Sequence, residues 1–223
     1  MGVRLDEPPI AVSLDHDEQR RAERFVFDRD RRRYVAAHTA LRVILGRFLG
    51  GYPADLQFAY EPRGKPRLVN APIDARFNLS HSADRALIAV AIGREVGIDL
   101  EQTRTIEDLT GVAEQSFSSA EREWLRQTPP ESRLEVFFRI WTRKESFIKA
   151  VGDGLHFPLD GFDVSAEPAG FQLLLACDAA PNELRRWTTR ALPCEPGFTA
   201  AITVERDGFD VRLATYSAGT IES

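Results

Sequence analysis

Residues 86–101 read ALIAVAIGREVGIDLE, and they combine two expected strands with a short turn. Ala86 to Ile92 is a continuous apolar run, which is typical of a buried strand. The next three residues predict a turn, and Val96 to Glu101 predicts a second strand. Asp99 and Glu101 stand two positions apart on this second strand, so their carboxylates point to the same face.

The Asp99–Glu101 pair has two interpretations. Two neighbouring carboxylates repel each other unless a cation lies between them or one of them is protonated. Carboxylate oxygens on a rigid strand suit Mg²⁺, which also accepts phosphate oxygens and water as ligands. The alternative is an edge strand with a polar outer face, and the short D-x-E pattern by itself does not exclude it.

Periodic apolar positions predict two long helices outside this stretch. The first runs from about Asp30 to Phe48 and the second from about Glu131 to Val151, where Gly152 ends it. Capping-box patterns at Thr105-x-x-Asp108 and Ser118-x-x-Glu121 predict a helix after each.

The tail of the chain predicts two hairpins. Phe162–Ser165 is expected to pair with Phe171–Ala176, and Thr199–Glu205 with Phe209–Thr215 through an Asp207-Gly208 turn. The order of helices and strands predicts an α+β protein with largely antiparallel sheets.

The second long helix carries Glu145 and Lys149 one turn apart, on the same face. An exposed ion pair at this spacing is worth about 0.2–0.5 kcal/mol and needs no function. Trp141 lies one turn earlier on that face, which indicates that the face is partly covered. A covered carboxylate beside an ammonium group suits a site for metal and phosphate.

Ser80, His81 and Ser82 follow Phe77-Asn78-Leu79 and offer three adjacent side-chain donors. Such a cluster can bind an anion, although the same residues also suit a plain turn. An arginine-rich segment from Arg20 to Arg33 adds a local charge surplus, which is interpreted either as a solvated helix face or as a patch for phosphates or an acidic partner.

The composition limits the possible classes of protein. The chain has 223 residues, of which 43% are hydrophobic and 28% charged, and its formal net charge is −5. Its acidity argues against a nucleic-acid partner. No apolar run approaches the roughly 20 residues of a membrane helix. Cys177 and Cys194 have no metal-binding or redox spacing, so we expect a reduced, cytoplasmic compartment.

Five of these motifs occur in the order and with the gaps of a known family. The chain resembles the 4′-phosphopantetheinyl transferases of the Sfp (surfactin-synthetase-activating) type over about residues 60–160. The matching stretches are Gly64-Lys65-Pro66, Phe77 to Ser82, Gly97 to Glu101, Phe117-Ser118-x-x-Glu121, and Trp141-x-x-Lys144-Glu145-Ser146 continuing to Leu155.

The resemblance implies a fold and an activity. The fold is a pseudo-dimer of two similar α+β halves, here residues 1–95 and 96–223, with the substrate in the cleft between them. Such enzymes transfer the 4′-phosphopantetheine arm of coenzyme A to a serine of an acyl carrier, peptidyl carrier or related carrier protein, and release adenosine 3′,5′-bisphosphate. The resemblance implies a monomer that works without nucleic acid or membrane.

The resemblance also assigns site residues. Asp99, Glu101 and Glu145 match the Mg²⁺ ligands, and Lys149 matches the lysine on the pyrophosphate. Residues expected around the coenzyme's nucleotide phosphates are Arg33, Arg63, Lys65, Ser80 and His81. Glu145 resembles the catalytic base, but Mg²⁺ lowers the pKa of a bound carboxylate, so either Glu145 is loosely coordinated or a metal-bound water takes the serine proton. The carrier protein and its pathway stay open.

Overall fold

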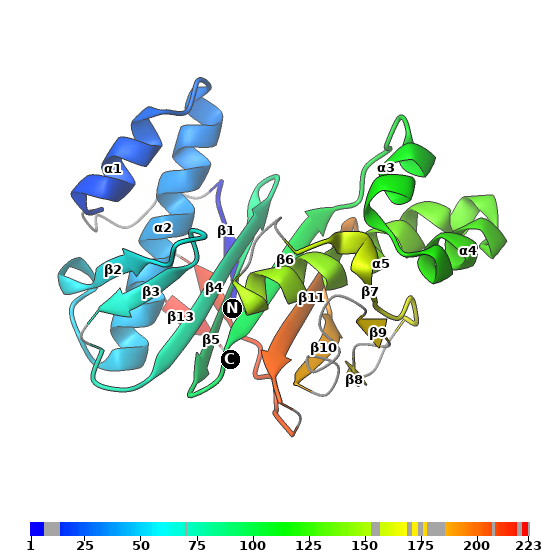
Figure 1. Cartoon of the computed structure of the whole chain (residues 1–223). Coiled ribbons are helices and arrows are strands. Elements are labelled where there is room, and N and C mark those ends of the chain that lie inside the picture. The colour runs from blue at the N-terminus through cyan, green and yellow to red at the C-terminus, as the bar shows by residue number, and fades with distance from the viewer. Residues whose placement is uncertain are drawn as a thin grey trace.

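A computed structural model describes residues 1–6, 14–69, 71–152, 157–168, 171–173, 176–177, 186–206, 208–217 and 220–222 (Figure 1). Over these residues the chain has two main sheets whose strands pair mostly in the antiparallel sense, together with several helices. The expected α+β fold class is therefore confirmed. In the described part of the chain, no helix has the length and apolar character needed to cross a membrane.

The first sheet has the strand order β13-β12-β1-β5-β4. Helix α2 packs on it and contributes much of a buried apolar cluster that includes Leu41, Leu45, Phe77 and Ile88. The helix ends where Gly50 takes a left-handed conformation with φ of 69°, which glycine adopts without steric cost. The strands are β1 (Gly2–Arg4), β4 (Ala75–Ser82), β5 (Arg85–Ile92), β12 (Thr215–Ser217) and β13 (Thr220–Glu222), and the helix is α2 (Asp28–Leu49).

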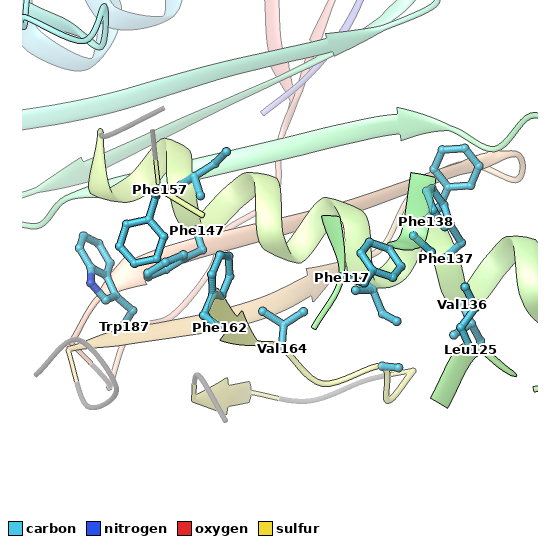
Figure 2. Packing of buried hydrophobic residues seen from close by; sticks show 14 of the residues in the cluster. Phe117, Leu125, Val136, Phe137, Phe138, Phe147, Phe157, Phe162, Val164 and Trp187 are labelled. Atoms are coloured by element: carbon cyan, nitrogen blue, oxygen red, sulfur yellow. The ribbon is translucent and has the colours of Figure 1, made fainter. Parts of the chain in front are cut away.

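The second sheet has the strand order β6-β11-β10-β8, and helix α5 packs on it. Figure 2 shows Phe147 of this helix lying against Phe157 and Phe162, with ring centroids 5.4 Å and 4.7 Å away. This aromatic group forms one end of the larger apolar cluster. The elements are β6 (Val96–Gln102), β8 (Phe171–Leu173), β10 (Trp187–Leu192), β11 (Phe198–Glu205) and α5 (Pro130–Val151).

The two sheets repeat one arrangement. In each, a first strand (β1 or β6) is followed by a 22-residue helix (α2 or α5) and later by two adjacent antiparallel strands. The last of these strands lies between the other two, giving β1-β5-β4 in one sheet and β6-β11-β10 in the other. The chain is thus a pseudo-dimer of two similar α+β halves, as the resemblance implied.

Shorter elements flank these halves (Figure 1). Helix α1 and the β2–β3 hairpin lie near α2, whereas α3 and α4 lie at the opposite end of the molecule. Ser118 and Glu121 form the expected capping box at the start of α4, while α3 begins after Asp108 rather than after Thr105. The bounds are α1 (His16–Glu23), η1 (Pro53–Asp55), β2 (Gln57–Tyr60), β3 (Pro66–Val69), α3 (Leu109–Ser116), α4 (Ser119–Gln127), η3 (Leu159–Gly161), β7 (Phe162–Asp163) and β9 (Ala176–Cys177).

The C-terminal strands differ from the sequence-based expectation. Strand β11 pairs with β10 and β6, so the expected hairpin of Thr199–Glu205 with Phe209–Thr215 is wrong. The turn residue Asp207 lies outside the described residues. Strand β12 instead pairs in parallel with β1 of the first sheet. A division into residues 1–95 and 96–223 therefore fits the sheets only up to β11, because the end of the chain returns to the first half.

The expected pairing of Phe162–Ser165 with Phe171–Ala176 is formed only in part. Strand β7 pairs with β9, whereas β8 pairs with β10 of the second sheet. Strand β8 thus pairs with β10, a strand of six residues, and not with β7, which has two.

Helix α5 lies directly on β6 because Gly97 has no side chain. A Cβ atom at Gly97 would lie 2.1 Å from the Ser146 carbonyl oxygen and 2.3 Å from the Ala150 amide nitrogen. Both atoms belong to the helix backbone, so neither can rotate away. The glycine brings the helix turn with Glu145 and Lys149 against the strand with Asp99 and Glu101.

We predict that Gly97→Ala lowers the free energy of unfolding by about 1–3 kcal/mol or more, because the added methyl group must push α5 from the sheet. Urea titration followed by tryptophan fluorescence measures the change. Gly51→Ala is the matched control, since nothing lies within 4 Å of a Cβ there. Equal midpoints for the two variants would contradict a close contact at Gly97.

Candidate functional site

Asp99 is the centre of the site between the two halves. Its side chain is buried, and the Lys149 ammonium group lies 2.5 Å from Oδ1. The Ser80 hydroxyl donates a hydrogen bond of 3.0 Å to the same oxygen. The other oxygen, Oδ2, is buried without a hydrogen-bond partner among the described residues. A buried carboxylate oxygen left unpaired is costly, so this atom is suited to receive a cation.

Glu101 and Glu145 complete a group of three carboxylates. Burial raises the pKa of Glu101 above its usual range, and the negative charge of Asp99 raises it further. Burial likewise raises the pKa of Glu145, which Asp99 and Glu101 also raise and Lys149 opposes. The three groups therefore repel one another, and one lysine does not neutralise them.

The donor chemistry of this group fits Mg²⁺. Three carboxylates with unfavourable mutual repulsion and a free Asp99 oxygen are what a hard divalent cation would bind. Over the described residues, however, no three His, Cys, Asp or Glu side chains converge closely enough to form a complete metal site. Asp99, Glu101 and Glu145 are the residues that could hold the ion, and Lys149 now occupies the Oδ1 atom of Asp99.

Strand β6 is held against β4 by a row of side chains. Asn78, Ser80 and Ser82 alternate along β4 and therefore point to one side. They accept hydrogen bonds from the backbone N–H groups of Ile98, Leu100 and Gln102, at 2.8, 3.2 and 3.1 Å respectively. We call Asn78, Ser80 and Ser82 the side-chain ladder. It joins the two halves at the strand that carries Asp99 and Glu101.

Successive side chains of β4 point to opposite sides of the strand, so Ser80, His81 and Ser82 do not form one cluster of donors. Ser80 and Ser82 face β6, whereas His81 between them is exposed. The motif lies on a strand, so the interpretation as a plain turn is wrong. Partial loss of hydration lowers the pKa of His81, and the charges of His38, Lys149 and Arg33 lower it further. His81 thus lies within electrostatic range of both Lys149 and Arg33.

A cavity of about 190 Å³ lies between α1, α2, the β2–β3 hairpin and β4. The Arg21 guanidinium lies 3.9 Å from the centroid of the Tyr60 ring on its wall. Beside it, the buried Tyr34 hydroxyl has no hydrogen-bond partner in the described part of the chain. The lining residues are Glu18, Arg21, His38, Leu41, Phe58, Tyr60, Gly64, Pro66, Asn78 and Leu79.

Sequence reasoning did not single out His38 or Tyr60, and it placed Arg21 only within the arginine-rich segment, because it did not predict helix α1, which forms one wall of this cavity. The signal was present: Asp15 and Glu18 form a capping box at the start of this helix. Glu18 also receives a 2.7 Å hydrogen bond from the fully buried Arg42 guanidinium, which fixes α1 against α2.

Lys65 has a different environment from that of a phosphate ligand. It is buried, and its ammonium group donates to Glu95 at 2.8 Å and to the Ala150 carbonyl oxygen at 2.6 Å. Burial lowers the pKa of Lys65, and Glu95 partly restores it. These contacts tie the β2–β3 hairpin to the C-terminal end of α5, one residue beyond Lys149. Arg63, by contrast, is exposed in the turn before Gly64.

The buried Lys144–Glu121 pair also belongs to the framework. The Lys144 ammonium group lies 2.8 Å from Glu121 and donates to the Leu159 and Phe162 carbonyl oxygens, each at 2.6 Å. Two motifs that resemble the family's thus hold α4 and α5 together. The glycine-rich stretch of residues 153–156 lies outside the described residues.

The chain is similar to known proteins along most of its length. Residues 95–203 match the family described as the 4′-phosphopantetheinyl transferase superfamily, and residues 9–93 match the family described as 4′-phosphopantetheinyl transferase, N-terminal. The chain is 38% identical over 224 residues to 4′-phosphopantetheinyl transferase HetI of a Nostoc species, covering 96% of this chain and 90% of that protein. It is 28% identical over 206 residues to 4′-phosphopantetheinyl transferase Sfp of Bacillus subtilis, covering 91% and 88%.

We predict that Lys65→Met lowers the free energy of unfolding by about 1–3 kcal/mol, because the buried Ala150 carbonyl group loses its charged donor. Chemical denaturation measures this loss. Exposed Arg122 on α4 gives a control, Arg122→Met, that should change stability much less. A Lys65 variant of unchanged stability that binds coenzyme A more weakly would instead make Lys65 a phosphate ligand.

Proposed function

The chain belongs to the 4′-phosphopantetheinyl transferase superfamily, and we propose that it transfers the 4′-phosphopantetheine arm of coenzyme A to a serine of an apo carrier protein with the help of Mg²⁺. The observation that carries this proposal is the Asp99 centre. This centre holds a buried carboxylate with one unpaired oxygen, two carboxylates of raised pKa and one lysine. The carboxylates suit a divalent cation, and the cation and the lysine suit a pyrophosphate.

Asp99, Glu101 and Glu145 would hold the Mg²⁺ ion in this proposal. When bound, the ion supplies positive charge that stabilises the pyrophosphate and the departing phosphate. Lys149 exchanges its contact with Asp99 for a phosphate oxygen, which keeps the ammonium group paired throughout. Its position on α5, one turn after Glu145, lets one helix face serve both the carboxylate and the phosphate.

The transfer needs a proton acceptor for the attacking serine. Its hydroxyl oxygen forms a bond to the β-phosphorus, the bond from that phosphorus to the bridging oxygen breaks, and adenosine 3′,5′-bisphosphate leaves. We assign the serine proton to Glu145, which requires that this carboxylate is only loosely coordinated, because a firmly bound cation lowers the pKa of its ligand. Without the ion, burial and two neighbouring carboxylates raise the pKa of Glu145, while Lys149 opposes them. If Glu145 binds the ion firmly, a metal-bound water takes the proton in its place.

The cavity of about 190 Å³ supports a place for the nucleotide end of the coenzyme. Tyr60 and His38 offer aromatic surfaces for a base, and Arg21 offers positive charge for a phosphate. His81 is within electrostatic range of Arg33, of Lys149 and of His38 on the cavity wall, so His81 and Arg33 suit the 3′-phosphate. Ser80 would reach the coenzyme only by giving up its contacts with Asp99 and Leu100, so we assign it to the support of Asp99.

The direct test incubates the protein with coenzyme A, Mg²⁺ and an apo carrier protein and measures the mass of the carrier. We expect the carrier to gain one phosphopantetheine group. Asp99→Asn should lower the rate by at least about a hundredfold, because the metal ion that neutralises the pyrophosphate loses a negatively charged ligand. Glu131→Gln on the exposed first turn of α5 is the matched control and should keep the wild-type rate. A normal rate for Asp99→Asn would exclude this metal assignment.

A second test concerns the 3′-phosphate. Dephospho-coenzyme A should be a poorer donor than coenzyme A, since it lacks the group that Arg33 and His81 are proposed to bind. His81→Ala should narrow the difference in kcat/KM between the two donors. If the variant loses the same factor with both donors, His81 does not contact the 3′-phosphate.

A further inference from the structure

We propose that Ser82 is a positioning residue for Glu101, which it holds in the orientation that receives the metal ion. This inference rests on the proposed function, because it assumes that Glu101 is a metal ligand. Ser82 touches neither coenzyme nor metal in this scheme. It acts through the Glu101 carboxylate, as the last member of the side-chain ladder.

The ladder works because β6 has two different edges. On one edge, all residues from Val96 to Gln102 are in register with β11. Backbone N–H groups along an antiparallel strand alternate between its two edges, and those of Ile98, Leu100 and Gln102 point to β4. Unpaired backbone donors at a buried junction are costly. Asn78, Ser80 and Ser82 satisfy them with side-chain oxygens instead of backbone carbonyl groups.

The two serines do something that Asn78 does not. Each serine hydroxyl accepts from the backbone N–H that follows a carboxylate and donates its own hydrogen to that carboxylate. Ser80 donates to Asp99 at 3.0 Å, and Ser82 donates to Glu101 Oε2 at 2.9 Å. A hydroxyl group has one hydrogen and two lone pairs, so both contacts can form at the same time. The Asn78 side chain accepts a hydrogen bond from the Ile98 N–H group. Among the described contacts, it forms no hydrogen bond with either carboxylate.

Ser82 matters more for its carboxylate than Ser80 does. Asp99 is also held by Lys149, at 2.5 Å from Oδ1. Among the described contacts, the Glu101 carboxylate receives its hydrogen bond from Ser82. Glu101 has a longer side chain than Asp99 and one more rotatable bond, so it loses more freedom when it binds an ion. Fixing that side chain in advance therefore strengthens metal binding.

The experiment measures Mn²⁺ binding by electron paramagnetic resonance, without coenzyme or carrier, and unfolding temperature in parallel. We expect Ser82→Ala to bind Mn²⁺ about tenfold more weakly, as is typical when a ligand loses its supporting hydrogen bond. Ser82→Thr keeps the hydroxyl and should restore the affinity. Asn78→Ala is the matched control: it also removes a ladder contact, so its unfolding temperature should fall while its Mn²⁺ affinity stays unchanged.

The outcomes separate the inference from the proposed function. If the wild-type chain does not bind Mn²⁺, the metal assignment fails and the positioning role fails with it. If the wild type binds Mn²⁺ and Ser82→Ala binds it equally well, Ser82 only joins the halves and the inference is overturned. An equal loss of affinity in Asn78→Ala would overturn it too. Should Ser82→Ala not fold, Ser82→Cys, whose thiol is a weak donor, replaces it in the same titration.

Discussion

The packing of β6 between three partners is the constraint on which the rest of the structure depends. One edge pairs with β11, the other edge is received by the side-chain ladder of β4, and one face touches the backbone of α5 at Gly97. A strand held on two edges and a face cannot shift its register. Asp99 and Glu101 are therefore fixed at the junction of the two halves, and α5 brings Glu145 and Lys149 to the same place. The Asp99 centre is a consequence of how the two halves join.

Buried charges in this protein serve two different purposes. Lys65, Lys144 and Glu121 are buried, but their partners lie in the framework, and they connect elements that are far apart in sequence. At the Asp99 centre the charges do not balance, because three carboxylates share one lysine and an oxygen stays unpaired. Such an imbalance lowers the stability of the folded chain. The Mg²⁺ ion of the proposed function would restore the balance of charge.

The local partners of the arginines between Arg20 and Arg33 show what several of them do. Arg20 pairs with Asp17 and Arg31 with Asp28 along the helices, which fits a solvated face. Arg21 instead lies over the Tyr60 ring at the cavity, although its side chain is still exposed. The solvated-face interpretation therefore fits Arg20 and Arg31. The interpretation as a phosphate patch stays a prediction, and the position of α1 over the β2–β3 hairpin directs it to Arg21.

The sequence by itself determined the two long helices, the strands of residues 86–101, the α+β class and the family, because these follow from local periodicity and from motif order. Tertiary structure alone decided which side of β4 each polar residue faces, that Lys149 meets Asp99 across the cleft, and that Lys65 is enclosed by Glu95 and α5. It also decided that β12 returns to β1. Local sequence is compatible with several partners for each of these groups. The choice is made by burial, since a charge or N–H group enclosed by the fold must find its partner among whatever the packing of distant segments places next to it.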